Sequence, residues 1–280
     1  MSITIDEKII KGINIDKKEV IKIQDAETLN ILWEEVKPVE EPVNDYLYVK
    51  NEYNGDNVVT ITEYVSGGSY SSNINNYWSK DNGQTWNSFK FDDQNVKTKT
   101  FTLKNGEYIH FKSPTQMWNN YNSSSSISYY RTITCSQTFS VGGNIKSVCM
   151  YDYPNLVCNY GFVGLFRNST NLVDASKLDL SNLKVGDYCF KNLFSGCTSL
   201  INSPILKLQT LKTGCYQQIF DGCTSLNEIT TYANDISATD CTYCWLRNVA
   251  TTGTFHNLGS ATYTINSSSG IPTGWTIVKN

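Results

Sequence analysis

The sequence predicts a multi-domain, mainly β protein that consists of an N-terminal β segment, a β-sandwich-like domain and a C-terminal solenoid of repeats. Three observations lead to this fold class. Residues 1–150 show period-2 alternation of β-forming side chains, which is typical of half-buried strands. All nine cysteines lie between Cys135 and Cys244, so composition changes along the chain. One phrase recurs in the second half at steps of 28 and then 26 residues, and fixed steps of this size indicate stacked units.

Composition excludes several classes of function. The 280 residues are 40% hydrophobic and 18% charged, which excludes disorder throughout. The net charge is −3, and only Arg131, Arg167 and Arg247 are arginines, so we expect no nucleic-acid binding. No stretch of about 18 apolar residues occurs, so we expect no membrane insertion. The charged start at residues 6–8 leaves no room for a secretory signal, which predicts synthesis in a cytoplasm.

Charge and composition divide the chain into four parts. Residues 1–36 have short alternating segments but are too few for an independent domain, so we expect a docking β segment that adds strands to a partner. Residues 37–45 carry two prolines and three acidic side chains, which is typical of a semi-extended linker. Residues 46–150 predict the sandwich-like domain, and residues 151–280 the repeats with a C-terminal cap.

Within the predicted sandwich, turn signals separate the strands. Val58, Thr60 and Thr62 alternate with neighbours of the opposite kind, as one face of a strand does. Residues 98–103 and 107–111 flank Lys104-Asn105-Gly106, and an Asn-Gly pair favours a β-hairpin between two such strands.

The repeats have an internal pattern of their own. LFRNSTNL at 165–172, LFSGCTSL at 193–200 and IFDGCTSL at 219–226 are copies of one phrase. Phe190, Leu193 and Phe194 lie at i, i+3 and i+4, which predicts one apolar face of a short helix. Gly196 follows where a left-handed helix end favours glycine. One such unit cannot bury its apolar face alone, but stacked units can.

The cysteines follow the same step, so stacking predicts columns of buried, reduced thiols. The predicted column residues are Cys189, Cys215 and Cys241, with Cys197 and Cys223 in a second column. Because column members point the same way into a core, we expect no disulfides among them.

FSGCTSL and FDGCTSL resemble the phrase of BspA-like leucine-rich repeats, which are common on gut bacteria and in gut-phage genomes. The similarity covers roughly residues 155–280, and the closing stretch at 245–278 resembles the end of such arrays in gut-phage proteins. The resemblance implies a leucine-rich-repeat solenoid used in adhesion, but it names no ligand.

A second motif lies in the predicted sandwich and fits the Asp-box pattern S-x-D-x-G-x-T-W. In this motif the aspartate bonds the backbone of its own turn, glycine supplies a positive φ, and tryptophan packs over the hairpin. Sialidases carry several such boxes together with an arginine cluster for the substrate carboxylate. This chain has one box and scattered arginines, so we expect a structural turn. The motif residues are Ser79, Asp81, Gly83, Thr85 and Trp86.

Candidate chemistry is sparse. Cys241-x-x-Cys244 has zinc or redox spacing, but a single pair supplies too few ligands for a structural zinc site. His110 and His256 lack a nucleophile motif beside them. We therefore expect no catalytic, metal or cofactor site. Five aromatic residues flank polar loops and would either stack on sugar rings or pack in hairpins. These candidates are Trp78, Trp118, Tyr121, Tyr129 and Tyr130.

The favoured hypothesis is a structural virion protein of a gut bacteriophage, in a tail or head appendage or fibre. It would dock to other virion proteins through residues 1–36 and present its repeats to a glycan or protein on the host surface. Such appendages are often symmetric homo-oligomers. The alternatives are a bacterial cell-surface BspA-like adhesin and, less favoured, a glycan hydrolase.

Overall fold

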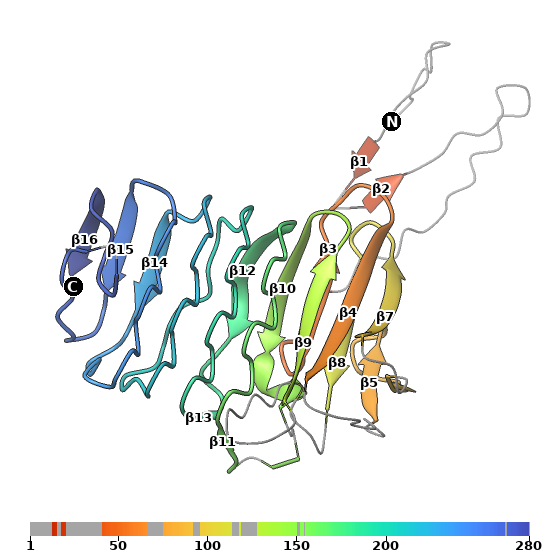
Figure 1. The fold of residues 1–280 in the computed structure, drawn as a ribbon. Helices are drawn as coiled ribbons and strands as arrows, with labels where there is room; N and C mark the ends of the chain where they lie inside the picture. Colours follow the sequence, from red (N-terminus) through yellow and green to blue (C-terminus); the bar gives the residue numbers. More distant parts are fainter. Residues whose placement is uncertain are drawn as a thin grey trace, which may run out of the picture. The chain divides into compact units, whose positions relative to one another are not determined.

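The computed structural model describes residues 13–15, 18–20, 41–66, 75–91, 96–113, 118, 128–149, 152–153, 155–266 and 268–279. The chain divides into two compact units, Met1–Glu41 and Pro42–Asn280 (Figure 1). Strand accounts for 38% of the described residues and helical turn for 2%. No described helix is long and apolar enough to cross a membrane.

In the first unit the structure describes one antiparallel strand pair, β1 (Ile13–Ile15) and β2 (Lys18–Val20). The rest of the predicted docking segment at 1–36, and residues 37–40 of the predicted linker, lie outside the described residues. Strand addition by this segment therefore stays a prediction.

The second unit begins with two β-sheets that face each other across an apolar core (Figure 1). Core side chains come from both sheets, for example Leu47 and Phe111 from one, and Ile61 and Ile133 from the other. The first sheet has the order β12 (Leu172–Asp179), β10 (Phe139–Asn144), β3 (Leu47–Asn51), β8 (Tyr108–Lys112), β5 (Asn76–Ser79), β6 (Asn87–Phe89). The second has the order β7 (Val96–Leu103), β4 (Asn57–Ser66), β9 (Ser128–Cys135).

The turn at Lys104-Asn105-Gly106 forms, but the hairpin predicted around it is wrong. Glu107 N–H donates to the Lys104 carbonyl at 3.0 Å, and Gly106 has φ 73°. The flanking strands do not pair with each other, because β7 pairs with β4 while β8 pairs with β3 and β5. The turn carries the chain from one sheet to the other, since both strands have a buried face that needs the opposite sheet.

The predicted leucine-rich-repeat solenoid with a helix in each repeat is also wrong. The described residues contain no α-helix, and the one helical turn is η1 (Ile145–Val148). The supposed helices are runs of tight turns, here called turn runs one to four, at 160–169, 188–197, 214–223 and 240–248. Short strands precede, separate and follow these runs: β11 (Val157–Cys158), β13 (Lys184–Val185), β14 (Glu228–Thr231), β15 (Gly253–Asn257) and β16 (Trp275–Lys279).

Hydrogen bonds in these runs alternate between two kinds of partner. In run two, Phe190 and Phe194 donate their N–H groups to carbonyls of run three, at 3.1 and 2.9 Å. Asn192 N–H also donates to run three, at the Gln217 carbonyl, whereas Lys191 and Leu193 bond within run two, as Leu193 N–H does to the Phe190 carbonyl at 3.1 Å. Every second amide thus joins neighbouring runs, which is how a strand bonds and not how a helix does.

A left-handed residue occurs at every fourth position of each run. In run two these are Tyr188, Asn192 and Gly196, with φ of 54°, 57° and 78°. Glycine adopts this conformation without strain, and asparagine tolerates it better than most residues. Gly196 is therefore explained by a repeated turn geometry and not by the end of a helix. The corresponding residues are Tyr160, Gly164 and Asn168 in run one, Gly214, Gln218 and Gly222 in run three, and Asp240, Cys244 and Asn248 in run four.

Equivalent side chains of successive runs lie on top of one another. The rings of Phe166 and Phe194 stack at 5.5 Å and 9° between planes, and those of Phe194 and Phe220 at 5.5 Å and 7°. Phe162, Phe190 and Tyr216 form a second buried ring column. The steps of 28 and 26 residues thus correspond to one layer of the stack each.

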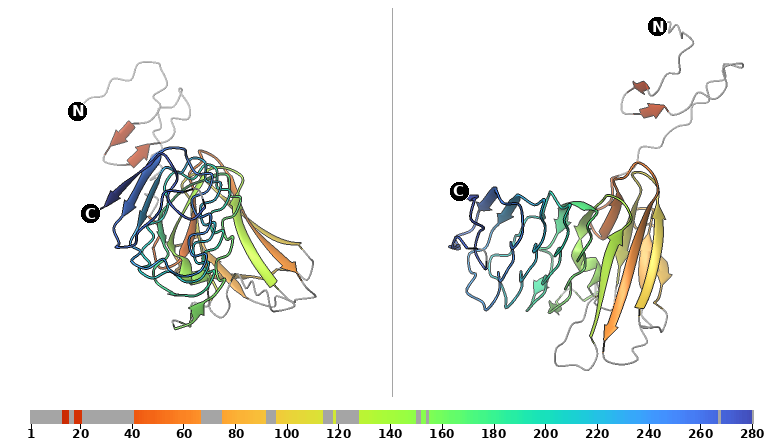
Figure 2. Two further views of the ribbon diagram at one scale, coloured as in Figure 1. Left: turned by 60° about the vertical axis from the view of Figure 1, so that its left-hand side comes forward. Right: turned by 45° about the horizontal axis from the view of Figure 1, so that its top comes forward.

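The sandwich covers the first layer of the stack, so both of its sheets continue into the repeats (Figure 2). β10 pairs in parallel with β12 across the boundary predicted at residue 150. On the other side, Ile133 N–H of β9 donates to the Leu165 carbonyl at 2.7 Å. These bonds pair part of the backbone edge that the first layer presents to the sandwich.

The C-terminal residues close the opposite end. β14, β15 and β16 form a parallel sheet, and the Trp245 ring stacks on Tyr263 at 5.4 Å. Trp245 Nε1 donates to the Gly270 carbonyl at 2.8 Å, and Trp275 Nε1 to the Ala250 carbonyl at 2.8 Å. The two indoles anchor the closing segment over the last turn run.

Candidate functional site

The five aromatic residues predicted to face a ligand have different fates in the structure. Trp118 is fully buried in the core, and the partly buried Trp78 packs on Phe101 at 5.4 Å. Tyr121 and the side chain of Tyr129 lie outside the described residues. Tyr130 is half-buried and lines a surface pocket, which neither Trp78 nor Trp118 does.

This pocket lies where the second sheet meets the turn runs and has a volume of about 210 Å³. Tyr130 comes from β9, Arg167 from turn run one and Lys191 from turn run two. The volume is below the usual range for drug-sized ligands, so a small group or one sugar unit is the size that fits. The other lining residues within the described part of the chain are Val163, Gly164 and Asn192.

Two stacked tyrosine pairs lie near the two basic residues. Tyr130 stacks on Tyr64 of β4 with centroids 4.7 Å apart, and Tyr188 stacks on Tyr160 at 5.0 Å. The Lys191 ammonium lies 5.4 Å from the centroid of Tyr188. Burial and the neighbouring Tyr64 raise the pKa of Tyr130, while the nearby Arg167 partly opposes this shift. The Tyr130 hydroxyl therefore stays protonated at neutral pH and can donate a hydrogen bond.

Neither Arg167 nor Lys191 makes an ion pair within the described residues. Two layers further along the stack, the position equivalent to Arg167 is Asp221, and the next is Arg247. Arg247 donates to Asp221 through two nitrogens, at 3.0 and 2.5 Å. The same column thus holds a neutralised arginine at one end and an arginine without a carboxylate at the pocket.

The left-handed turn geometry shapes the pocket. Gly164 has φ 64° and Asn192 has φ 57°, and these two residues are equivalent in neighbouring runs. Gly164 presents no Cβ to the pocket, and an added Cβ would contact the Arg167 side chain at 3.5 Å. The backbone itself therefore forms part of the pocket wall beside the guanidinium group.

The Asp-box residues form a tight loop at the end of β5. Both carboxylate oxygens of Asp81 accept from the Thr85 N–H, at 2.9 and 3.1 Å, and Ser79 Oγ donates to Asp81 at 2.6 Å. Gly83 has φ 78°, and its N–H donates to Ser79 Oγ at 2.9 Å. Hydrogen bonds from Ser79 and Thr85 lower the pKa of Asp81 to about 2. The carboxylate is engaged by its own turn.

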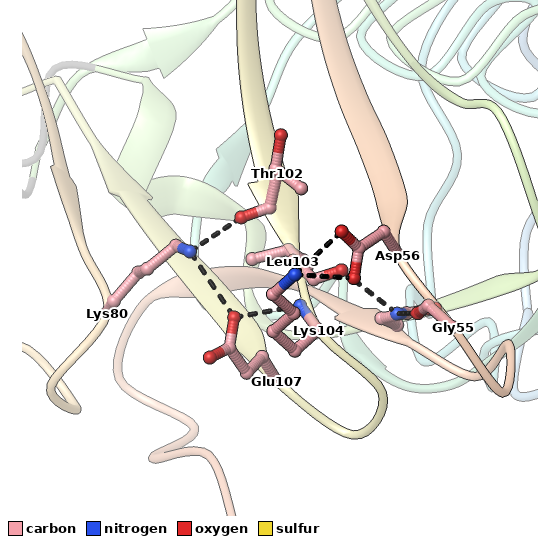
Figure 3. A network of polar contacts seen from close by, with 8 residues as sticks. Gly55, Asp56, Lys80, Thr102, Leu103, Lys104 and Glu107 are labelled. Atoms are coloured by element: carbon pink, nitrogen blue, oxygen red, sulfur yellow. Dashed lines mark hydrogen bonds and ion pairs between the residues drawn. The ribbon is translucent and has the colours of Figure 1, made fainter.

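Trp86 of the Asp-box packs edge-on against Tyr46 at 4.8 Å, and the Lys112 ammonium lies 4.1 Å from the Trp86 ring centroid. Lys80 joins this loop to the β7–β8 turn, because its ammonium contacts the Thr102 carbonyl at 2.6 Å and Glu107 at 3.3 Å (Figure 3). These contacts are exposed, so they position the loop more than they stabilise the fold.

The histidines do not form a catalytic arrangement with the neighbours that the structure describes. His110 is fully buried, its Nε2 lies 3.2 Å from the Val43 carbonyl, and burial lowers its pKa. His256 on β15 lies 3.3 Å from Glu228 on β14. The two histidines belong to separate sheets.

The repeat cysteines are buried free thiols. Cys215 lies between its equivalents Cys189 and Cys241, and burial raises the pKa of Cys215 to about 12. In the second column, Cys197 Sγ donates to the Phe166 carbonyl at 3.0 Å and Cys223 Sγ to the Phe194 carbonyl at 3.1 Å. Each of these two thiols therefore bonds the preceding layer.

Among the described residues, no group of three or more potential ligands could hold a metal ion. No family model, curated protein or solved structure matches the chain. Sequence reasoning missed Arg167 and Lys191 as site residues, because they belong to separate turn runs. The repeat step of 28 residues could have indicated this pair, since it places Gly164 beside Asn192 in the next layer. Arg167 lies three residues after Gly164 and Lys191 directly precedes Asn192, so the two basic residues come close together.

Proposed function

We propose that this chain is a non-catalytic recognition protein that binds a host-surface glycan through the pocket between Tyr130, Arg167 and Lys191. The observation that carries the proposal is the combination of tyrosine rings with two cations that lack a carboxylate partner in the described residues. Tyrosine offers a flat apolar face and a hydroxyl, which together suit a sugar ring. The rigid stack behind the pocket supports preorganised binding.

Its setting would be the virion of a gut bacteriophage, in a tail or head appendage or fibre component. The support comes from the phrase that resembles BspA-like repeats and from the predicted docking role of residues 1–36. The stacked turn runs support this role as well, because they extend away from the sandwich as a rigid arm within the second unit (Figure 2).

Two measurements test the proposal. Mass spectrometry of purified virions should detect the chain, and the fluorescently labelled full chain should bind cells of the host bacterium. Detection in a bacterial envelope fraction and not in virions would favour a surface adhesin instead. Release of sugar from host capsule by the purified protein would contradict the non-catalytic role.

A further inference from the structure

We infer that the pocket selects a sugar that carries a carboxylate, such as a uronic or sialic acid residue, over its neutral counterpart. This inference rests on the proposed recognition role and gives that role a ligand class. The carboxylate would lie between the Arg167 guanidinium and the Lys191 ammonium, and the ring would lie along Tyr130.

The charge pattern of the stack supports an anionic ligand. Elsewhere in the Arg167 column, the chain provides its own carboxylate: Asp221 is 11% exposed and binds Arg247 with a forked geometry. At Arg167 the equivalent position in the next layer is Ser195, which carries no charge. Arginine binds carboxylates in this forked way. The pocket therefore has a guanidinium group, as Arg247 has, but among its described residues no carboxylate that corresponds to Asp221.

The second cation makes the pocket specific for charge and not merely polar. Lys191 comes from the neighbouring layer, and its ammonium lies beside the Tyr188 ring. Two positive charges at one small pocket repel each other and gain from an anion placed between them. The lining residues that the structure describes include no acidic side chain to take that position.

The size and ring content favour a sugar acid over a bare ion. A volume of about 210 Å³ exceeds what a carboxylate alone would fill, and Tyr130, held by its stacking on Tyr64, adds an aromatic wall. Tyr130 and Asn192 supply a hydroxyl and an amide for ring hydroxyl groups. The ligand class that uses all of these groups is a monosaccharide unit with one carboxylate.

The test uses the full chain and paired oligosaccharides. Trigalacturonate and sialyllactose are each compared with their carboxylate methyl esters, by saturation-transfer NMR and titration at low and physiological ionic strength. At least one acidic sugar should bind, and its neutral partner should have an affinity at least about tenfold lower. Higher salt should lower the affinity for the acidic sugar more than that for the neutral one.

Variants locate the binding. Arg167→Gln and Lys191→Gln should each lower the affinity for the acidic sugar by about tenfold, and Arg167→Lys should retain part of that affinity. Lys184→Gln is the matched control, because it removes one exposed positive charge on β13 outside the pocket lining. All four variants should unfold cooperatively, near the temperature of the parent protein.

The outcomes separate this inference from the proposed function. Equal binding of the acidic and neutral sugars, or binding by Arg167→Gln and Lys191→Gln at the strength of the parent, would overturn the acidic-sugar inference. Cell binding that persists while none of the four sugars binds would overturn it too, but leave the recognition role intact. If the parent chain binds neither host cells nor any of the sugars, the proposed recognition function itself is wrong.

Discussion

The cores of the sandwich and of the stack contain different kinds of side chain. The sandwich buries charge: Glu63 and Arg131 are fully buried, and Lys97 is 3% exposed in its side chain. Arg131 Nε donates to Glu63 at 2.8 Å, and the Lys97 ammonium lies 3.5 Å from the other carboxylate oxygen. In the stack, the Asp221–Arg247 pair is partly exposed through Arg247, and the core contains ring and thiol columns.

This difference shows what repetition supplies. In the stack, each buried group meets its own equivalent in the next layer, so one layer sets the position of the next. The sandwich has no such repeat, and its strands need individual partners. The buried cluster of Glu63, Arg131 and Lys97 joins β4, β9 and β7 at one register, and a shifted register would leave charges buried without partners.

The largest expected effect is in the stack. Phe194→Ala should lower the free energy of unfolding by about 3–5 kcal/mol, because it removes a ring held between Phe166 and Phe220. Phe194→Leu should cost clearly less, since most of the volume remains. Urea unfolding of both variants measures the difference. Equal, small losses would contradict a packed ring column.

The buried cluster of the sandwich should respond next. Arg131→Met should cost about 3 kcal/mol, near the lower end for breaking a buried pair because Lys97 still contacts Glu63. The matched change Arg247→Met in the stack should cost about 1 kcal/mol or less, since Arg247 is 43% exposed. If the two variants lost equal stability, the contrast between the regions would not hold.

The thiol column should give an intermediate effect. Cys215→Ser should cost about 1–3 kcal/mol, because it buries a hydroxyl with few partners, whereas Cys215→Ala should cost less. In the native protein the thiols should also react slowly with iodoacetamide, since burial raises the pKa of Cys215 and leaves little thiolate. Rapid labelling of Cys189 or Cys215, or a disulfide between them, would contradict the stacked column.

The smallest effect distinguishes turns from a helix by two neighbouring substitutions. Gln218 has φ 54°, so Gln218→Gly should change stability by no more than about 0.5 kcal/mol or should stabilise the protein. The adjacent change Gln217→Gly lacks this relief and should cost about 1 kcal/mol. In a helix both changes would cost the same. Thermal unfolding of the two variants, compared with the parent, gives the answer.

The spacing of left-handed residues also explains why the sequence predicts helices in the repeats. A run with one left-handed residue in every four buries pairs of side chains, such as Cys189 with Phe190 and Leu193 with Phe194. Over eight residues this period of four matches the helical i, i+3, i+4 pattern. The signal that distinguishes the two structures is the residue type at the left-handed positions, since Asn192 and Gly196, which tolerate positive φ, lie four residues apart.

Other parts of the sequence differed in how much they could reveal. The mainly β composition and the layer-to-layer equivalence of Phe166, Phe194 and Phe220 followed from alternation and from the repeat steps. The crossing of Lys104-Asn105-Gly106 between sheets did not, because a turn signal says nothing about the strand partner. The pocket needs side chains from three separate segments, which local patterns cannot bring together.

The most direct test of the stacked-turn account is the backbone conformation of turn runs two and three in solution. NMR couplings and carbon chemical shifts should show positive φ at Asn192 and Gln218, with ring contacts between Phe166, Phe194 and Phe220. The amides of Phe190 and Phe194 should exchange slowly, because they bond the next layer. Negative φ throughout 188–197 and 214–223, with the continuous amide–amide contacts of a helix, would contradict the account.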